Sequence, residues 1–211
     1  MAISGRLGAV YVQTATAPQT FTTQATTANS ARTRYTITNT TYRYWSLTDA
    51  ISVYVDAVLQ TSGYTLERAG GVVVFATPRG PAEAVTVTGK YVTLAQAAGF
   101  YNWSAEVGNE PIDVTEFQPT SGWRSFLQVG IKEWSFSAEA YWTANDPTLF
   151  TRLTAGSPVV VVLYMTGAGG QTADTRFEGY AVLDSEGIEN TSGDVVKFSI
   201  SGTGLDVFAY R

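Results

Sequence analysis

Carboxylates and tryptophans stand close together in the segment IDVTEFQPTSGWRSFLQVGIKEWSFSAEAYW, residues 112–142. Glu133, Glu139 and Asp146 could supply the paired acid and base of a glycosidase, which cleaves a sugar between two carboxyl groups. Tryptophans such as Trp134 would then stack on the sugar rings. The alternative is that the same residues form a strand whose aromatic side chains fill a core.

The alternation of side chains in this segment favours the strand. Residues 133–142 place two sets on opposite faces: Trp134, Phe136, Ala138, Ala140 and Trp142 on one, and Ser135, Ser137, Glu139 and Tyr141 on the other. An acid and a stacking aromatic that serve one groove should share a face. We therefore interpret Glu139 as a solvated strand residue and Asp146 as the N-cap of a helix that begins at Pro147.

Other chemistries have little support in the sequence. The chain has no histidine and no cysteine, which removes the Ser-His-Asp arrangement, thiolate catalysis and the commonest metal ligands. The glycine-rich GAGGQTAD (167–174) has no lysine and opens no helix, so we interpret it as a hairpin loop. DVTE (113–116) lacks the longer acidic loop of a calcium site. We expect no catalytic residue, metal or cofactor, and therefore no enzyme.

The elements that position these residues are mainly strands. Val10–Val12, Arg34–Leu47, Ile51–Gln60 and several pieces up to Tyr91 are rich in β-branched and aromatic residues, and Val159–Met165 is typical of one buried strand. RFEGYAVL (176–183) and DVVKFSIS (194–201) alternate apolar and polar residues. Thr14–Asn29 consists largely of Thr, Ala and Gln, and we interpret it as an extended linker or surface arm. The tryptophans Trp45, Trp103 and Trp123 are more typical of a core or a subunit interface than of a sugar site.

Charge divides the chain into two parts. Residues 1–93 carry seven Lys and Arg and four Asp and Glu, a net +3, whereas residues 94–211 carry six and fourteen, a net −8. The acidic part argues against a nucleic-acid-binding surface, which needs clustered Lys and Arg. The start of the chain lacks an apolar signal region, and no stretch has the length of a membrane span.

Five motifs, taken in order, suggest a family. They are MAISGRLGAVYV, FYNWSAEVGNEPIDVTEFQ, GWRSFLQVGIKEWSFSAEAYW, DPTLFTRLTAG and RFEGYAVLDSEGIENTSGDVVKFSISGTG. In this order they resemble the major tail tube protein of long-tailed, non-contractile bacteriophages. The resemblance covers residues 1–13 and about 94–211. Residues 14–92 intervene where family members pass quickly between two strands, so we interpret them as a β-rich domain inserted in a hairpin loop.

The resemblance implies an antiparallel β-sandwich or barrel with one helix, plus the small inserted all-β domain. It also implies subunits that form hexameric rings, which stack into a hollow tail tube for DNA ejection. Partners would be other copies of the chain, the tape measure protein and the tail terminator or baseplate proteins. DNA would pass through the lumen without specific binding. The protein would be made in the host cytoplasm and located in the virion tail.

Two sets of residues follow as sites. The long loop of about residues 106–130 would reach an adjacent subunit or ring, with Trp123, Phe126 and Leu127 as its apolar contacts. The polar strand faces would include the lumen wall, with Glu139, Ser137, Ser135, Lys197 and Ser199 as candidates.

Two expectations concern the inserted domain. It should lie on the tube exterior, and its removal should leave tubes that still assemble. The alternative function is that of another tail, baseplate or adhesion protein that binds a host glycan through this domain.

Overall fold

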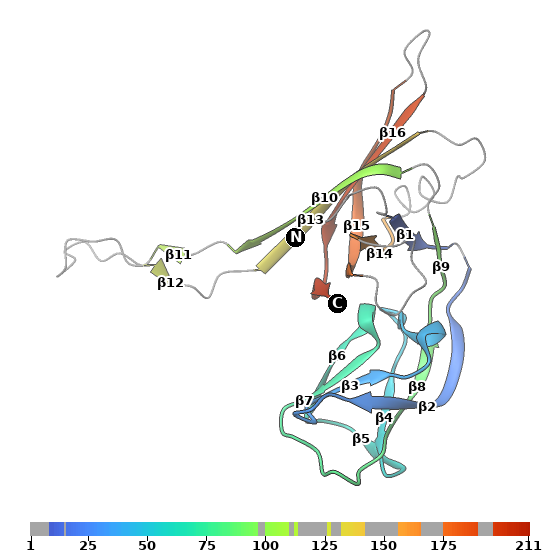
Figure 1. The fold of residues 1–211 in the computed structure, drawn as a ribbon, viewed down its shortest axis with the longest axis vertical. Helices are drawn as coiled ribbons and strands as arrows, with labels where there is room; N and C mark the ends of the chain where they lie inside the picture. Colours follow the sequence, from blue (N-terminus) through green and yellow to red (C-terminus); the bar gives the residue numbers. More distant parts are fainter. Residues whose placement is uncertain are drawn as a thin grey trace, which may run out of the picture.

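The computed structural model describes residues 9–14, 16–96, 100–109, 112–113, 126–127, 132–141, 156–165, 175–189 and 196–211. It is mainly β, as expected, with two large antiparallel sheets and a two-stranded one (Figure 1). In this part of the chain helical structure is confined to the short 3₁₀ turns η2 (Thr40–Tyr42) and η3 (Arg68–Gly70). The helix expected from Pro147 lies outside the described residues.

The first sheet has the strand order β10-β13-β16-β15-β14-β1-β9, with β17 pairing with β15. Its strands are β1 (Ala9–Gln13), β9 (Leu94–Gln96), β10 (Phe100–Asn109), β13 (Lys132–Tyr141), β14 (Val159–Tyr164), β15 (Arg176–Glu189), β16 (Lys197–Gly204) and β17 (Ala209–Tyr210). The two-stranded sheet pairs β11 (Ile112–Asp113) with β12 (Phe126–Leu127).

The first sheet curls around its own core. Trp134 and Phe136 of β13 belong to the same buried cluster as Val161 of β14 and Val10 of β1, although β16 and β15 separate β13 from β14 in the sheet. Strands that are not neighbours can share a core only if the sheet bends over it. The outer faces of β13 and β14 therefore point away from each other, on opposite sides of this core.

Three glycines make room for the aromatic side chains of β13. A Cβ at Gly179 would lie 2.5 Å from the Trp134 ring, a Cβ at Gly202 would lie 2.6 Å from the Phe136 ring, and Gly204 also lies directly against the Trp134 indole. The indole N–H donates to the carbonyl of Asp206 at 2.8 Å. The glycines of the FEGY and SGTG motifs thus serve close packing.

The second unit is formed by strands β2–β8, residues 19–91, in the order β5-β4-β8-β2-β3-β7-β6. Its strands are β2 (Gln19–Ala28), β3 (Arg34–Ile37), β4 (Ser52–Val55), β5 (Val58–Gln60), β6 (Tyr64–Glu67), β7 (Val72–Phe75) and β8 (Val85–Tyr91). All of them fall within residues 14–92, the segment expected to be an insert. Its core contains Phe21, Tyr35, Trp45, Val53 and Val87.

The prediction of a linker at Thr14–Asn29 is wrong over most of its length, because Gln19–Ala28 forms β2. Within this strand Phe21 is the buried residue, so the sequence shows no apolar alternation. The pairing of β2 with β8 shifts register between Phe21 and Gln24, and Thr23 there has a φ of 47°. Because of this bulge β2 bends, and its second half pairs with β3.

β14 is buried on both faces. Val159, Val161 and Leu163 face the core of the first sheet, whereas Val160 and Val162 belong to a cluster that contains Ala69 and Val92 from the segment of the second unit. Every residue from Val159 to Leu163 is 0% exposed. This double burial explains why the strand reads as a continuous apolar run.

The same contact corrects the alternation expected for residues 176–183. Arg176, Glu178 and Tyr180, which alternate there with more apolar residues, are all buried. Tyr180 packs in the cluster with Val162 and Ala69, and its hydroxyl donates to the carbonyl of Trp45. The second unit therefore covers this half of β15 and shares a core with the first sheet.

The shared core predicts that the two sheets unfold together. Val161→Ala removes two methyl groups from the core of the first sheet, and Val162→Ala removes the same groups from the contact with the second unit. Each change should lower the free energy of unfolding by about 2 kcal/mol, as buried truncations of this size do. Urea unfolding followed by tryptophan fluorescence measures both. A Val162→Ala effect near zero would mean that the second unit is not part of the cooperative core, and its removal would then be tolerated.

Candidate functional surfaces

One outer face of the first sheet is open to solvent, and we call it the open face. It extends over β10, β13, β16 and the end of β15, where Ser104, Ser137, Ser201 and Ser185 lie side by side across the four strands. On β13 the residues Glu133, Ser135, Ser137, Glu139 and Tyr141 are exposed, and those between them are buried. The two faces expected for residues 133–141 are thus confirmed.

Hydroxyl groups on the open face bind one another. Ser104 and Ser137 are joined by a hydrogen bond of 2.8 Å, and so are Ser185 and Ser201. Thr203 donates to the Asp184 carboxylate at 2.6 Å, next to this row. Because these groups satisfy one another, the centre of the open face has few hydroxyls that need a ligand.

The charge of the open face is mainly negative. Its exposed acids are Glu106, Glu133, Glu139, Asp184 and Glu189, and Lys197 is the one lysine or arginine among its described side chains. Repeated in an assembly, this surface would carry a strongly negative potential.

A shallow hollow of about 180 Å³ lies at one end of the open face. Its lining residues are Tyr101, Glu139, Gly187, Ile188, Glu189, Lys197, Phe198 and Ser199. The rings of Tyr101 and Tyr141 lie 4.7 Å apart between centroids. Partial desolvation and the neighbouring Glu139 carboxylate raise the pKa of the Tyr101 phenol. Tyr101 therefore stays neutral at physiological pH.

The structure brings all five lumen candidates together. Glu139 pairs with Ser199 in the register of β13 and β16, and Ser137 and Ser135 follow along the same face of β13. Lys197 lies opposite Tyr141 at the end of the same face. Asn102 and Ser104 of β10 lie beside them, and Asn102 donates to Glu139 at 3.4 Å. These two residues were not predicted from the sequence: the alternation in YNWSAEV puts them on one face of a strand but does not show that this strand pairs with β13.

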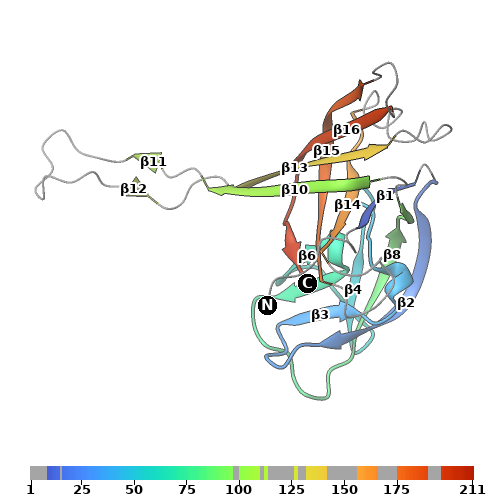
Figure 2. The same cartoon turned by 45° about the horizontal axis from the view of Figure 1, so that its top comes forward.

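The expected assembly loop is described in part. Trp123 lies outside the described residues, and Phe126 and Leu127 form β12, paired with Asp113 and Ile112. Figures 1 and 2 both show β11 and β12 well away from the two large sheets. Of the other tryptophans considered, Trp45 is 0% exposed in the second unit, and Trp103 packs against the core of the first sheet. Both tryptophans therefore fill a hydrophobic core, as expected.

The outer edge of the first sheet is β10. Within the described part of the chain, this ten-residue strand pairs with β13 along one side and has no strand along the other. Val107 on this strand is 64% exposed. An open edge of this length is a template for a strand from another molecule.

Neither a metal site nor a membrane helix is found in the described ranges. They contain no group of three or more acidic side chains arranged to hold a metal ion. None of their helical segments is long and apolar enough to cross a bilayer.

Comparison with known proteins gives structural neighbours alone. No family model and no curated protein matches the chain. One similar solved structure is the tail of an empty GTA particle with C6 symmetry, at 16% identity and a TM-score of 0.46, covering 56% of this chain and 86% of the other. Another is the virion of a native gene transfer agent particle, at 14% identity and a TM-score of 0.47, covering 56% and 88%.

The hollow predicts a measurable coupling between Tyr101 and Glu139. Glu139→Gln removes the negative charge and should lower the pKa of the Tyr101 phenol, which desolvation then still keeps raised. Glu133→Gln, on the same face but farther along β13, serves as the control. Tyrosine-selective ¹³C NMR titration, with Tyr101→Phe for assignment, measures the shift. Equal Tyr101 pKa values in both glutamine variants would contradict the proximity of the two groups.

Proposed function

We propose that this chain is a structural subunit of a phage tail tube, which joins other copies into hexameric rings that stack around a channel for DNA ejection. It acts by assembly and not by catalysis, and its place is the virion tail. The tape measure protein and the tail terminator or baseplate proteins are its proposed partners there. The order of sequence motifs described above supports the proposal, and one structural observation carries it.

That observation is the open β10 edge at the end of a sheet with an acidic outer face. A soluble protein must pair or protect such an edge. Pairing β10 with a different edge of a second copy is a head-to-tail contact, and head-to-tail contacts close into rings when the rotation allows. A ring closed in this way has no open β10 edge.

The open face suits the wall of a DNA channel. Its acids repel phosphates, and its serines already bind one another, so few groups remain that would hold a passing duplex. The proposal assigns Glu139, Ser137, Ser135, Lys197 and Ser199 to this wall.

The second unit is proposed to lie on the tube exterior, with residues 1–13 and 93–211 as the tube domain. The curled core separates the open face from the outer face of β14, which the second unit covers. If the open face lines the channel, the second unit therefore points away from it. An inserted unit of about 80 residues would be roughly 25–30 Å across, too wide for six copies to share a narrow bore.

The segment around β11 and β12 is proposed to reach an adjacent subunit or ring. Figures 1 and 2 show β11 and β12 well away from the two large sheets, and the proposal assigns Trp123, Phe126 and Leu127 to the contact with a neighbour. A tryptophan anchored at such an interface contributes about 2–4 kcal/mol.

Edge pairing can be tested with two matched valines. Val107→Lys puts a charge on the β10 edge, whereas Val58→Lys makes the same change on β5, an edge strand of the second unit where Val58 is 63% exposed. We expect Val107→Lys to fold but polymerise poorly, because a lysine opposes strand addition. Val58→Lys should assemble normally. Sedimentation and negative-stain microscopy measure this, and normal tubes of Val107→Lys would exclude β10 as the joining edge.

The channel wall can be tested by reversing one charge. Virions with Glu139→Lys in every subunit should assemble but eject DNA more slowly at low ionic strength, because the new cations bind phosphate in a salt-dependent way. Glu83→Lys makes the same reversal on the second unit and should eject normally. Ejection is followed by fluorescence of a DNA dye over a salt series. Normal low-salt ejection by Glu139→Lys would remove Glu139 from the wall.

A further inference from the structure

Arg211 is bound to the first sheet through its backbone. It follows β17, whose residues pair with Phe177 and Glu178 of β15. Its N–H donates to the carbonyl of Arg176 at 3.0 Å, and its carbonyl accepts from the N–H of Arg176 at 3.0 Å. The base of the Arg211 side chain is therefore fixed relative to β15.

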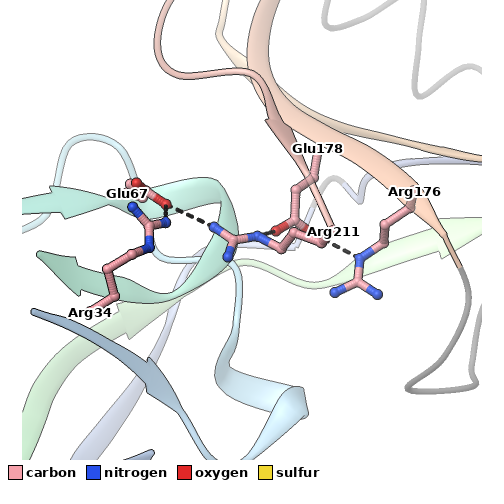
Figure 3. A network of polar contacts seen from close by, with 5 residues as sticks. All are labelled: Arg34, Glu67, Arg176, Glu178 and Arg211. Atoms are coloured by element: carbon pink, nitrogen blue, oxygen red, sulfur yellow. Dashed lines mark hydrogen bonds and ion pairs between the residues drawn. The ribbon is translucent and has the colours of Figure 1, made fainter. Parts of the chain in front are cut away.

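The guanidinium of Arg211 connects the first sheet to the second unit (Figure 3). Its Nε forms an ion pair with Glu178 of β15, and its Nη2 lies 2.9 Å from Glu67 of β6. Glu67 is also held by Arg34 of β3 at 2.5 Å. Burial opposes ionisation of Glu67, but the two guanidinium groups outweigh it and hold its pKa below the usual 4.5.

The buried carboxylate of Glu178 needs the ion pair with Arg211. Its side chain is 0% exposed, and its other oxygen lies 2.9 Å from Arg176 Nε. A buried carboxylate loses its hydration, and ion pairs must offset that loss. Arg176 contacts one oxygen of Glu178 and Arg211 the other, so the loss of Arg211 leaves one oxygen without this ion pair.

In the second unit, the guanidinium of Arg211 lies directly against Gly70. A Cβ added at Gly70 would collide with Nη2, Cζ and Nε of Arg211. Gly70 ends the turn η3, which follows Glu67 directly in the sequence. Glu67 and Gly70 therefore belong to one short segment of the second unit. Arg211 contacts both of them when the second unit lies on the first sheet as it does here.

We propose that residues 209–211 are a clasp that holds the second unit in a single orientation on the first sheet. The cluster around Val162, with the hydrogen bond from Tyr180 to the carbonyl of Trp45 beside it, attaches the unit at one place. Most of that contact is apolar, and apolar contacts are not directional. The paired charges of Arg211 are directional, because a guanidinium binds carboxylates in a fixed fork geometry. The clasp is a property of the single chain and goes beyond the proposed assembly.

The absence of cysteine from these 211 residues allows a direct test in the intact chain. Cysteines at Val58, in the second unit, and Ser137, on the open face, take spin labels at exposed positions without competing thiols. Pulsed electron spin resonance then gives the distribution of distances between the two parts. One narrow maximum is expected for the chain that carries the two labels and no further change.

Three further variants separate the clasp from general charge effects. Arg211→Ala should broaden the distribution or split it into several maxima. Gly70→Ala should do the same while it retains Arg211. Arg34→Ala is the matched control: it also removes an arginine from Glu67, but both residues lie in the second unit, so the distribution should stay narrow. Circular dichroism checks that each variant is folded.

The outcomes decide the proposal in each case. Narrow distributions for folded Arg211→Ala and Gly70→Ala, equal to that of Arg34→Ala, would overturn it. If Arg211→Ala does not fold, Arg211→Lys replaces it. A lysine keeps the charge but lacks the fork that contacts Glu67 and Glu178 together. A broadened distribution in folded Arg211→Lys supports the clasp, and a narrow one overturns it.

Discussion

The burial of β14 on both faces is the constraint on which the rest of the structure depends. One face of Val159–Tyr164 needs the curled sheet, and the other needs the second unit. If β14 had alternated apolar and polar residues, the second unit could have been a separate domain joined to the first sheet by linkers alone. Here it completes the core, so residues 19–91 are part of one folded body with the first sheet.

This constraint divides the outer surface of the first sheet into two zones. The covered zone comprises β14 and the first half of β15, and the open face comprises β10, β13, β16 and the end of β15. The change occurs within β15, where the register shifts between Leu183 and Ser185: residues up to Leu183 are mostly buried, and those from Asp184 onward are exposed where their side chains are described. A bulge at this point changes the direction of the strand. The first half of β15 therefore lies in the covered zone and its end lies in the open face.

Local patterns predicted much of this and failed where the partner is distant in sequence. The alternation of residues 133–141 and the apolar run of β14 were sufficient to place those strands, and the same alternation placed Glu139 and Ser137 on the exposed side. β2 was missed because Phe21 is the buried residue in an otherwise polar strand. The burial of Arg176 and Glu178 could not be foreseen, because Arg211 and the cover from the second unit reach them through tertiary contacts. The neighbours of Glu139 on β10 depend on strand register, which alternation within one strand does not fix.

The division into zones also limits how copies of the chain can meet. The covered zone is occupied by the chain itself. Among the described residues, a neighbour can reach the edge strands β10 and β9 of the first sheet, its open face, and the separate pair of β11 and β12. The open face is a poor protein interface, because its acids would face desolvation without enough cations of its own to offset them. In the proposed assembly, contacts would therefore use the strand edges and the segment around β11 and β12, which leaves the acidic face in water. In such an assembly the open face lies either inside the ring of subunits or on its outside. Ring closure by strand pairing at the β10 edge favours the inside.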